Sequence, residues 1–191
     1  MISWIWNKWL IGGMACLLLL NFPVEAFSQK ATIRDIQVKG PSGDWKVSFV
    51  MENCFPEKVE EAIRAGTPTS FTFYLQLYQA KNWWRDRRLV SLRFQHTIQY
   101  HPIRGEYQVS FDEQETSKVT QGFEEAKGWM ARVQDVGIRP PASEMNRDAV
   151  TYLRIRAELE LVRLPLHLEY LLPFMSLWNL KTDWYVEPLY P

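Results

Sequence analysis

The amino-acid sequence predicts a mainly β domain with two helices (α+β), in which an antiparallel, sandwich-like sheet is built on a long meander. The main observation is that residues 69–111 contain three successive segments with apolar side chains at every second position. Residues 45–51 and 150–162 show the same period, which is typical of β-strands. Helical spacing of apolar side chains occurs in residues 53–66 and 123–130. A chain of 191 residues is long enough for one domain with a hydrophobic core.

The meander is the centre of the predicted sheet. Its first two strands flank the sequence NWWRDRR and carry apolar residues at alternate positions, namely Phe71, Phe73, Leu75, Leu77, Val90, Leu92, Phe94, Ile98 and Tyr100. Because successive side chains of a strand point to opposite faces, these residues define one apolar face. The sequence HPIRG predicts a tight turn, since Pro102 has a fixed φ and Gly105 can adopt a positive φ. The third strand follows, with Tyr107, Val109 and Phe111.

A hairpin and a helix are predicted before the meander. Residues 31–39 alternate imperfectly, which is typical of an edge strand, and the turn GPSGDW joins them to residues 45–51. Pro56 suits the first turn of the helix in residues 53–66, and Gly66 supplies its C-terminal stop. The chain then enters the meander.

After the meander the pattern is less regular. Residues 112–121 (DEQETSKVTQ) are predicted to form a surface connection, and two adjacent prolines place residues 139–148 in an exposed loop. Residues 150–162 are the longest predicted strand. Its polar face carries charges of both signs, from Arg154, Arg156, Glu158 and Glu160. These charges would stabilise the strand only modestly if water surrounds them.

Residues 1–26 predict a signal peptide. Lys8 precedes an apolar run over residues 10–20, and the sequence Val-Glu-Ala ending at Ala26 suits a signal peptidase. Cleavage after Ala26 would leave residues 27–191 as a single β-rich envelope domain. The expected location is the periplasm or the cell envelope.

The alternative is a retained N-terminal membrane anchor in the inner membrane, with membrane association through residues 4–22. Trp4, Trp6 and Trp9 would then lie at the membrane interface. The unbroken apolar stretch is about a dozen residues, whereas a spanning helix needs roughly twenty. The length of the stretch therefore favours cleavage.

Charge and cysteine content exclude several classes of function. Cleavage would remove Lys8 and Glu25, so the 22 basic and 22 acidic residues would each fall by one and the domain would stay neutral. We therefore expect no nucleic-acid partner, because phosphate-backbone binding needs a clustered excess of cations. Cys54 would be the remaining cysteine, so no intramolecular disulfide can form. No histidine is near it in sequence, which predicts a structural thiol and not a nucleophile.

The other ionisable residues do not have the spacing of a catalytic or metal site. His96 falls on the apolar face of its strand, which predicts a core histidine, and His101 and His167 are far from it in sequence. The adjacent carboxylates at residues 60–61 and 124–125 lie on predicted helices, where neighbours point about 100° apart. We therefore expect no catalytic residue, no metal and no cofactor, and the assignment as an enzyme is uncertain, leaning to no.

The unusual sequence of the meander tip predicts an interaction surface. Two adjacent tryptophans cannot both point inward from a regular strand, and arginines flank them. Tryptophan and arginine are enriched where binding energy concentrates, which makes Trp83, Trp84, Arg85 and Arg87 the candidate surface. The alternative is structural: one tryptophan folds back onto the sheet and Asp86 pairs with an arginine.

The order of these features resembles that of a known family. The motifs are a helix ending in AGTP, the strand SFTFYLQLY, the WW tip, the strand ending in QYHPIRGEYQV, the strand YLRIRAELELVRLPL, and the late tryptophans Trp178 and Trp184. Over about residues 31–186 they resemble an uncharacterised exported bacterial protein family, domain of unknown function 4390. This chain has Thr182 where the family has a serine two residues before its final tryptophan. The resemblance carries over no catalytic residue, and it implies a link to a two-component sensor kinase.

These observations together favour a non-enzymatic binding or accessory module of the envelope, with an envelope or membrane protein as its partner. The alternative is an envelope glycan hydrolase whose carboxylates come from separate strands. A concave cleft that holds two carboxylates about 5–10 Å apart on rigid strands would favour the enzyme, whereas a filled core would favour the binding module.

The predicted cleavage site gives a direct test. We expect the protein isolated from its native host to begin at Phe27, because the apolar run is too short for a spanning helix. N-terminal sequencing checks this expectation. A sequence that starts at Met1 would instead support the membrane anchor.

Overall fold

The computed structural model describes residues 30–81, 85–146, 149–161 and 180–189. The predicted signal peptide or anchor lies outside these residues. Within them, no helix is both long enough and apolar enough to cross a membrane.

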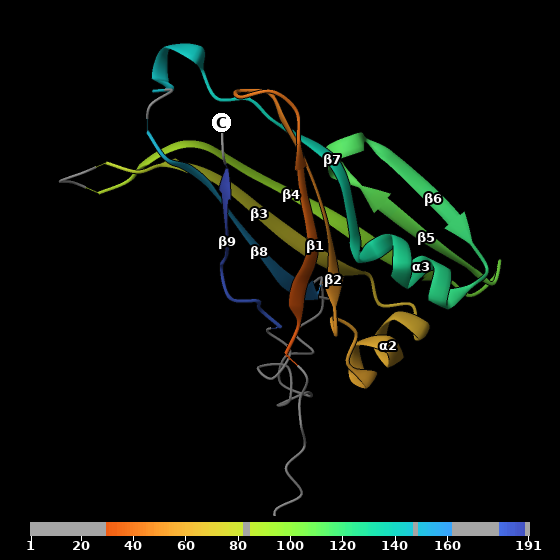
Figure 1. The fold of residues 1–191 in the computed structure, drawn as a ribbon. Helices are drawn as coiled ribbons and strands as arrows, with labels where there is room; N and C mark the ends of the chain where they lie inside the picture. The colour runs from red at the N-terminus through yellow and green to blue at the C-terminus, as the bar shows by residue number, and fades with distance from the viewer. Residues whose placement is uncertain (1–29, 82–84, 147–148, 162–179, 190–191) are drawn as a thin grey trace, which may run out of the picture.

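The described strands form two antiparallel sheets, which confirms the predicted mainly β, sandwich-like fold. The smaller sheet has the order β1-β2-β7, formed by β1 Thr32–Lys39, β2 Trp45–Glu52 and β7 Arg132–Ile138. The larger sheet has the order β6-β5-β4-β3-β8-β9, formed by β6 Thr116–Thr120, β5 Glu106–Phe111, β4 Arg87–His101, β3 Thr69–Gln79, β8 Thr151–Leu161 and β9 Tyr185–Leu189. Figure 1 shows β1 and β2 lying across β3 and β8.

Strand β3 is the centre of the larger sheet, as the meander predicted. It pairs along its whole length with β4 on one side and with β8 on the other, so Phe73 lies between Phe94 and Ala157. The side chains on its inner face are fully buried, namely Phe71, Phe73, Leu75 and Leu77. A strand buried between two neighbours and under a second sheet is strongly fixed in register.

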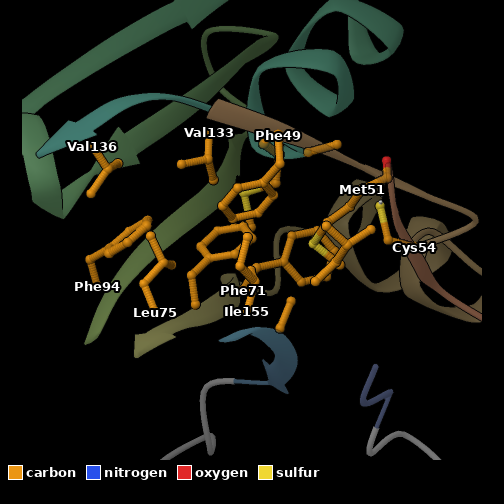
Figure 2. Packing of buried hydrophobic residues seen from close by; sticks show 14 of the residues in the cluster. Phe49, Met51, Cys54, Phe71, Leu75, Phe94, Val133, Val136 and Ile155 are labelled. Atoms are coloured by element: carbon orange, nitrogen blue, oxygen red, sulfur yellow. Dashed lines mark hydrogen bonds between the residues drawn. The ribbon is translucent and has the colours of Figure 1, made fainter. Parts of the chain in front are cut away.

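The core lies between the inner faces of the two sheets. Figure 2 shows Phe49 and Val133 of the smaller sheet facing Phe71 and Leu75 of the larger one. The ring centroids of Phe49 and Phe73 are 5.6 Å apart in an edge-to-face arrangement. Aromatic pairs of this kind stabilise a core beyond their buried area. The alternation predicted for residues 45–51 is therefore confirmed as the inner face of β2.

Both predicted helices are present, as α2 (Glu57–Arg64) and α3 (Phe123–Met130). Each buries one stripe of side chains, namely Val59, Ile63, Ala126 and Met130. Lys127 joins the two helices, since its Nζ lies 2.6 Å from a carboxylate oxygen of Glu60. Gly66 has a φ of +89°, which is the left-handed conformation that ends a helix.

The first strand is an edge strand, as predicted. Its pairing with β2 shifts register between Arg34 and Gln37, and Asp35 has a φ of +52°. This irregularity explains the imperfect alternation of the sequence. A bulge also protects an exposed edge against pairing with other chains.

The structure corrects the prediction for residues 112–121 and adds two strands that were not predicted. The expected surface connection is a 3₁₀ turn, η1 (Asp112–Gln114), followed by β6, which pairs with the outer edge of β5. Strand β7 pairs with β2, and β9 pairs with β8. All three are edge strands of five to seven residues, so their pairing depends on the neighbouring strand more than on their own apolar pattern.

The centre of the core predicts a large effect of truncation. We expect Phe73→Ala to lower the free energy of unfolding by about 3–5 kcal/mol, because it removes a ring packed against Phe49 and Phe94 and leaves a cavity. Denaturant titration measures the change. Ser91→Ala, on the exposed face of the neighbouring strand, is the control and should stay within about 0.5 kcal/mol. A loss of the same size in both variants would contradict the packing described above.

Candidate functional site

The β3–β4 hairpin extends beyond the strand next to it. Strand β5 pairs with β4 only along His96–His101, whereas β3 pairs with β4 as far as Gln79 and Arg87. Figure 1 shows the hairpin projecting away from the rest of the molecule. Arg85 and Arg87, the described part of the predicted interaction surface, therefore lie towards the end of a projecting arm.

Polar contacts hold the base of this arm in place. The hydroxyl of Tyr152 donates a hydrogen bond of 2.5 Å to Asp86, and Asp86 also accepts the backbone N–H of Lys81 at 3.4 Å. The Tyr152 and Tyr78 rings stack with centroids 5.5 Å apart. Burial and the Asp86 carboxylate raise the pKa of Tyr152 to about 12, so its proton stays in this hydrogen bond at neutral pH.

The four predicted surface residues can be placed only in part. Trp83 and Trp84 lie outside the described residues. Arg85 is exposed, and Arg87 forms an ion pair of 2.8 Å with Glu144. Asp86 contacts Tyr152 and the backbone of Lys81. The partner of Arg87 is instead Glu144, which lies before β8 in the chain. The role of this tip as an interaction surface stays a prediction.

His96 is a fully buried core histidine, as predicted. Its Nδ1 lies 3.1 Å from the backbone oxygen of Met130, and its Nε2 lies 2.9 Å from a carboxylate oxygen of Glu113. The imidazole ring therefore lies between two oxygen atoms, one from α3 and one from η1. The second carboxylate oxygen of Glu113 is buried without a hydrogen-bond partner. This pair ties η1 and α3 to β4.

A cleft of about 350 Å³ opens between the two sheets beside this pair. Its lining includes the acidic residues Asp112, Glu113 and Asp135. Asp112 accepts the backbone N–H of Gln95 at 3.2 Å, and Glu113 is held by His96. Two of the three carboxylates therefore already take part in contacts that fix η1 against β4. Asp112 and Glu113 lie in η1 and not on regular strands. The glycan hydrolase hypothesis expected carboxylates on separate strands.

The remaining candidate residues have structural contacts. The Cys54 thiol is buried, and its Sγ lies 3.8 Å from the backbone oxygen of Met51, in keeping with the predicted structural role. His101 lies 3.2 Å from the Gln108 side chain, and His167 is outside the described residues. In the part of the chain that the structure describes, no three His, Cys, Asp or Glu side chains are grouped as metal ligands.

The outer face of β8 carries a cluster that the sequence pattern did not predict. The Arg154 guanidinium lies 4.6 Å from the ring centroid of Trp184 and 5.5 Å from that of Tyr78. Arg156 lies 5.4 Å from the same tryptophan ring and forms an ion pair with Glu158. Both arginines are half-buried and not surrounded by water. The reason is that residues 180–189 pair along the edge of β8 and bring the Trp184 ring against both arginines.

Thr182 fixes the return of the chain. Its hydroxyl accepts the backbone N–H of Ala157 at 3.0 Å, and its own N–H donates to the backbone oxygen of Ala157 at 3.0 Å. The side-chain oxygen thus replaces a backbone acceptor beside β8. A serine could make the same bond, which gives a physical reason for a hydroxyl residue two positions before Trp184. The hydroxyl residue at position 182 was the one feature of the sequence that pointed to its contact with the backbone of Ala157.

The comparisons with known proteins identify a family but no function. The model of one family, described as a domain of unknown function (DUF4390), matches residues 28–187. No curated protein and no solved structure matches the chain.

The buried thiol predicts a pH dependence of stability. Burial raises the pKa of Cys54 from its ordinary value of 9.0 to about 12. Above about pH 9 the unfolded chain loses this proton and the folded protein keeps it, so stability falls as the pH rises towards 12. We expect Cys54→Ala to lose about 1.4 kcal/mol less than the unchanged protein between pH 7 and pH 10.

Denaturant titrations of both proteins at the two pH values measure this difference. Tyrosines and lysines titrate in the same pH range, but both proteins contain them. Their contribution to the pH dependence of stability therefore cancels in the comparison. The same loss of stability in the two proteins would show that the thiol ionises without hindrance in the folded state.

Proposed function

The chain belongs to the DUF4390 family, and from this premise we propose that it is a non-enzymatic binding or accessory module of the bacterial envelope. It binds an envelope or membrane protein through the end of the β3–β4 hairpin. The observation that carries the proposal is the projecting arm, which ends in exposed guanidinium groups at Arg85 and Arg88. Loops that a rigid scaffold holds away from the core are common sites of recognition.

The contacts at the base of the arm support this role. Tyr78 and Tyr152 stack across β3 and β8, and the Tyr152 hydroxyl holds Asp86 in the tip. The Arg87–Glu144 ion pair fixes the other side of the hairpin. A surface that is already ordered loses less conformational entropy when it binds.

The proposed location follows from the N-terminal sequence. Residues 1–26 would direct export and leave a periplasmic domain, or would stay as an inner-membrane anchor. The family resemblance adds a two-component sensor pathway as the cellular setting. An exported module with no net charge suits a protein partner better than a nucleic acid.

The inter-sheet cleft supports a second candidate, the envelope glycan hydrolase. Asp112, Glu113 and Asp135 line it, and two carboxylates are what glycoside hydrolysis uses. The structural contacts of Asp112 and Glu113 count against this candidate, because a catalytic acid must be able to reach its substrate. Release of soluble product from peptidoglycan by the purified protein would favour the hydrolase and contradict the binding module.

The arm gives a direct test in the native host. A photo-crosslinking residue at position 88 should form a covalent adduct with a specific envelope protein, which mass spectrometry identifies. Changing Trp83 and Trp84 to Ser, and Arg85 and Arg87 to Ala, should abolish the adduct. The melting temperature should change little, since Arg85 is exposed and a solvent-exposed ion pair such as Arg87–Glu144 contributes about 1 kcal/mol or less.

The matched control lies at the other end of β4. Ile103→Ser with Arg104→Ser changes an exposed apolar residue and an exposed arginine in the HPIRG turn. This variant should keep the adduct. If the quadruple variant instead melts at a much lower temperature and still forms the adduct, the tip contributes to the core and is not the interaction surface.

A further inference from the structure

The cluster on the outer face of β8 has hydrogen-bond donors without acceptors. The Nε atoms of Arg154 and Arg156 are buried and have no hydrogen-bond partner, whereas the Nη2 of Arg156 faces the Glu158 carboxylate in the ion pair given above. A buried donor that lacks an acceptor destabilises the folded state. These Nε atoms are enclosed by the protein, so a ligand would meet the Nη groups at the ends of the two side chains.

The charges on this face are not balanced. Glu158 is the carboxylate of the cluster, and it already contacts Arg156, the Nζ of Lys181 at 2.9 Å and the hydroxyl of Tyr74 at 3.5 Å. Arg154 has no ion pair with any carboxylate in the described part of the chain. Among the described side chains of the cluster, three cations therefore share one anion, which leaves an excess of positive charge beside the half-buried arginines. The side chain of Glu160, on the same face, lies outside the described part of the chain.

Aromatic rings hold the Arg154 guanidinium in a fixed place. It lies between the Trp184 and Tyr78 rings, at 4.6 and 5.5 Å from their centroids. In such a cation–π contact the Nη groups of the guanidinium stay available to a hydrogen-bond acceptor. A carboxylate fits that plane, because its two oxygens can accept two parallel N–H bonds.

We propose that Arg154 and Arg156 bind the carboxylates of an extended acidic peptide segment of a partner protein. The two arginines are alternate residues of one strand, so they are about 7 Å apart along it. Alternate side chains of an extended peptide have the same spacing, and two acidic residues in a Glu-X-Glu sequence can therefore meet both arginines. The exposed side chain of Val186, opposite Arg154 on β9, adds an apolar contact beside them.

A peptide fits these observations better than a membrane surface does. Lipid headgroups bring phosphates at no fixed spacing, whereas the arginine pair is held at the spacing of a strand. This surface is also distinct from the tip of the β3–β4 hairpin. Its ligand can be tested while residues 82–88 stay unchanged, so the outcome does not depend on the proposed role of the tip.

The test is fluorescence anisotropy with the full chain and a labelled peptide, Thr-Glu-Val-Glu-Val-Glu-Thr. The same peptide with Gln for each Glu is the ligand control. We expect the acidic peptide to bind at least about 10-fold more tightly than the Gln peptide, and binding to weaken in high salt. Arg154→Gln and Arg156→Gln should each weaken it by about 10-fold or more. Arg104→Gln makes the same change of net charge far from the site and should have no effect.

Lysine variants separate binding from folding. Arg154→Lys keeps the charge and loses the planar fork, so it should fold and bind with reduced affinity. Full affinity in the folded Gln variants would overturn the proposal, and so would an equal loss in Arg104→Gln. Vesicles of phosphatidylglycerol are the last arm of the test. Arginine-dependent binding to vesicles without binding to the peptide would assign the face to a membrane and overturn the peptide proposal.

Discussion

The burial of one face of β3 is the constraint on which the rest of the structure depends. The inner side chains of this strand are fully buried under the smaller sheet, and it pairs with β4 and β8 along its whole length. A shift of one residue would turn every one of these side chains to the opposite face. The register of the three central strands is therefore fixed by the core. The two helices and the edge strands then cover what these strands leave open.

The same register places the polar side chains on the outer face. Rows of paired residues cross the sheet, so Tyr78 meets Tyr152, and Tyr74 meets Arg156. The aromatic and cationic cluster of β8 is thus a consequence of how the core is packed on the other side of the same strands. The projecting hairpin has the same origin, because β3 and β4 stay paired beyond the point where β5 ends. Both proposed binding surfaces therefore lie beside the fully paired central strands.

One polar pair crosses from the larger sheet to the elements that cover it. His96 reaches the backbone of Met130 in α3 and the side chain of Glu113 in η1, among the rings of Phe73 and Phe111. Breaking such a pair by removing one partner would leave a buried polar group without its bond. This pair also accounts for Glu113, which lines the cleft but is held by the histidine. A carboxylate in a cleft is therefore not by itself a sign of catalysis here.

The sequence by itself determined the central sheet, the two helices, the turns at GPSGDW and HPIRG, and the core position of His96. These features follow from local chemistry, because alternation, helical spacing, glycine and proline act within a few neighbouring residues. Only the tertiary structure decided the pairing of β6, β7 and β9, the contact of His96 with Glu113, and the contact of Trp184 with Arg154. Each of these joins segments whose partners are not apparent from sequence spacing. A short edge strand pairs because a neighbour offers it free backbone groups, and an arginine becomes half-buried because a distant segment returns over it.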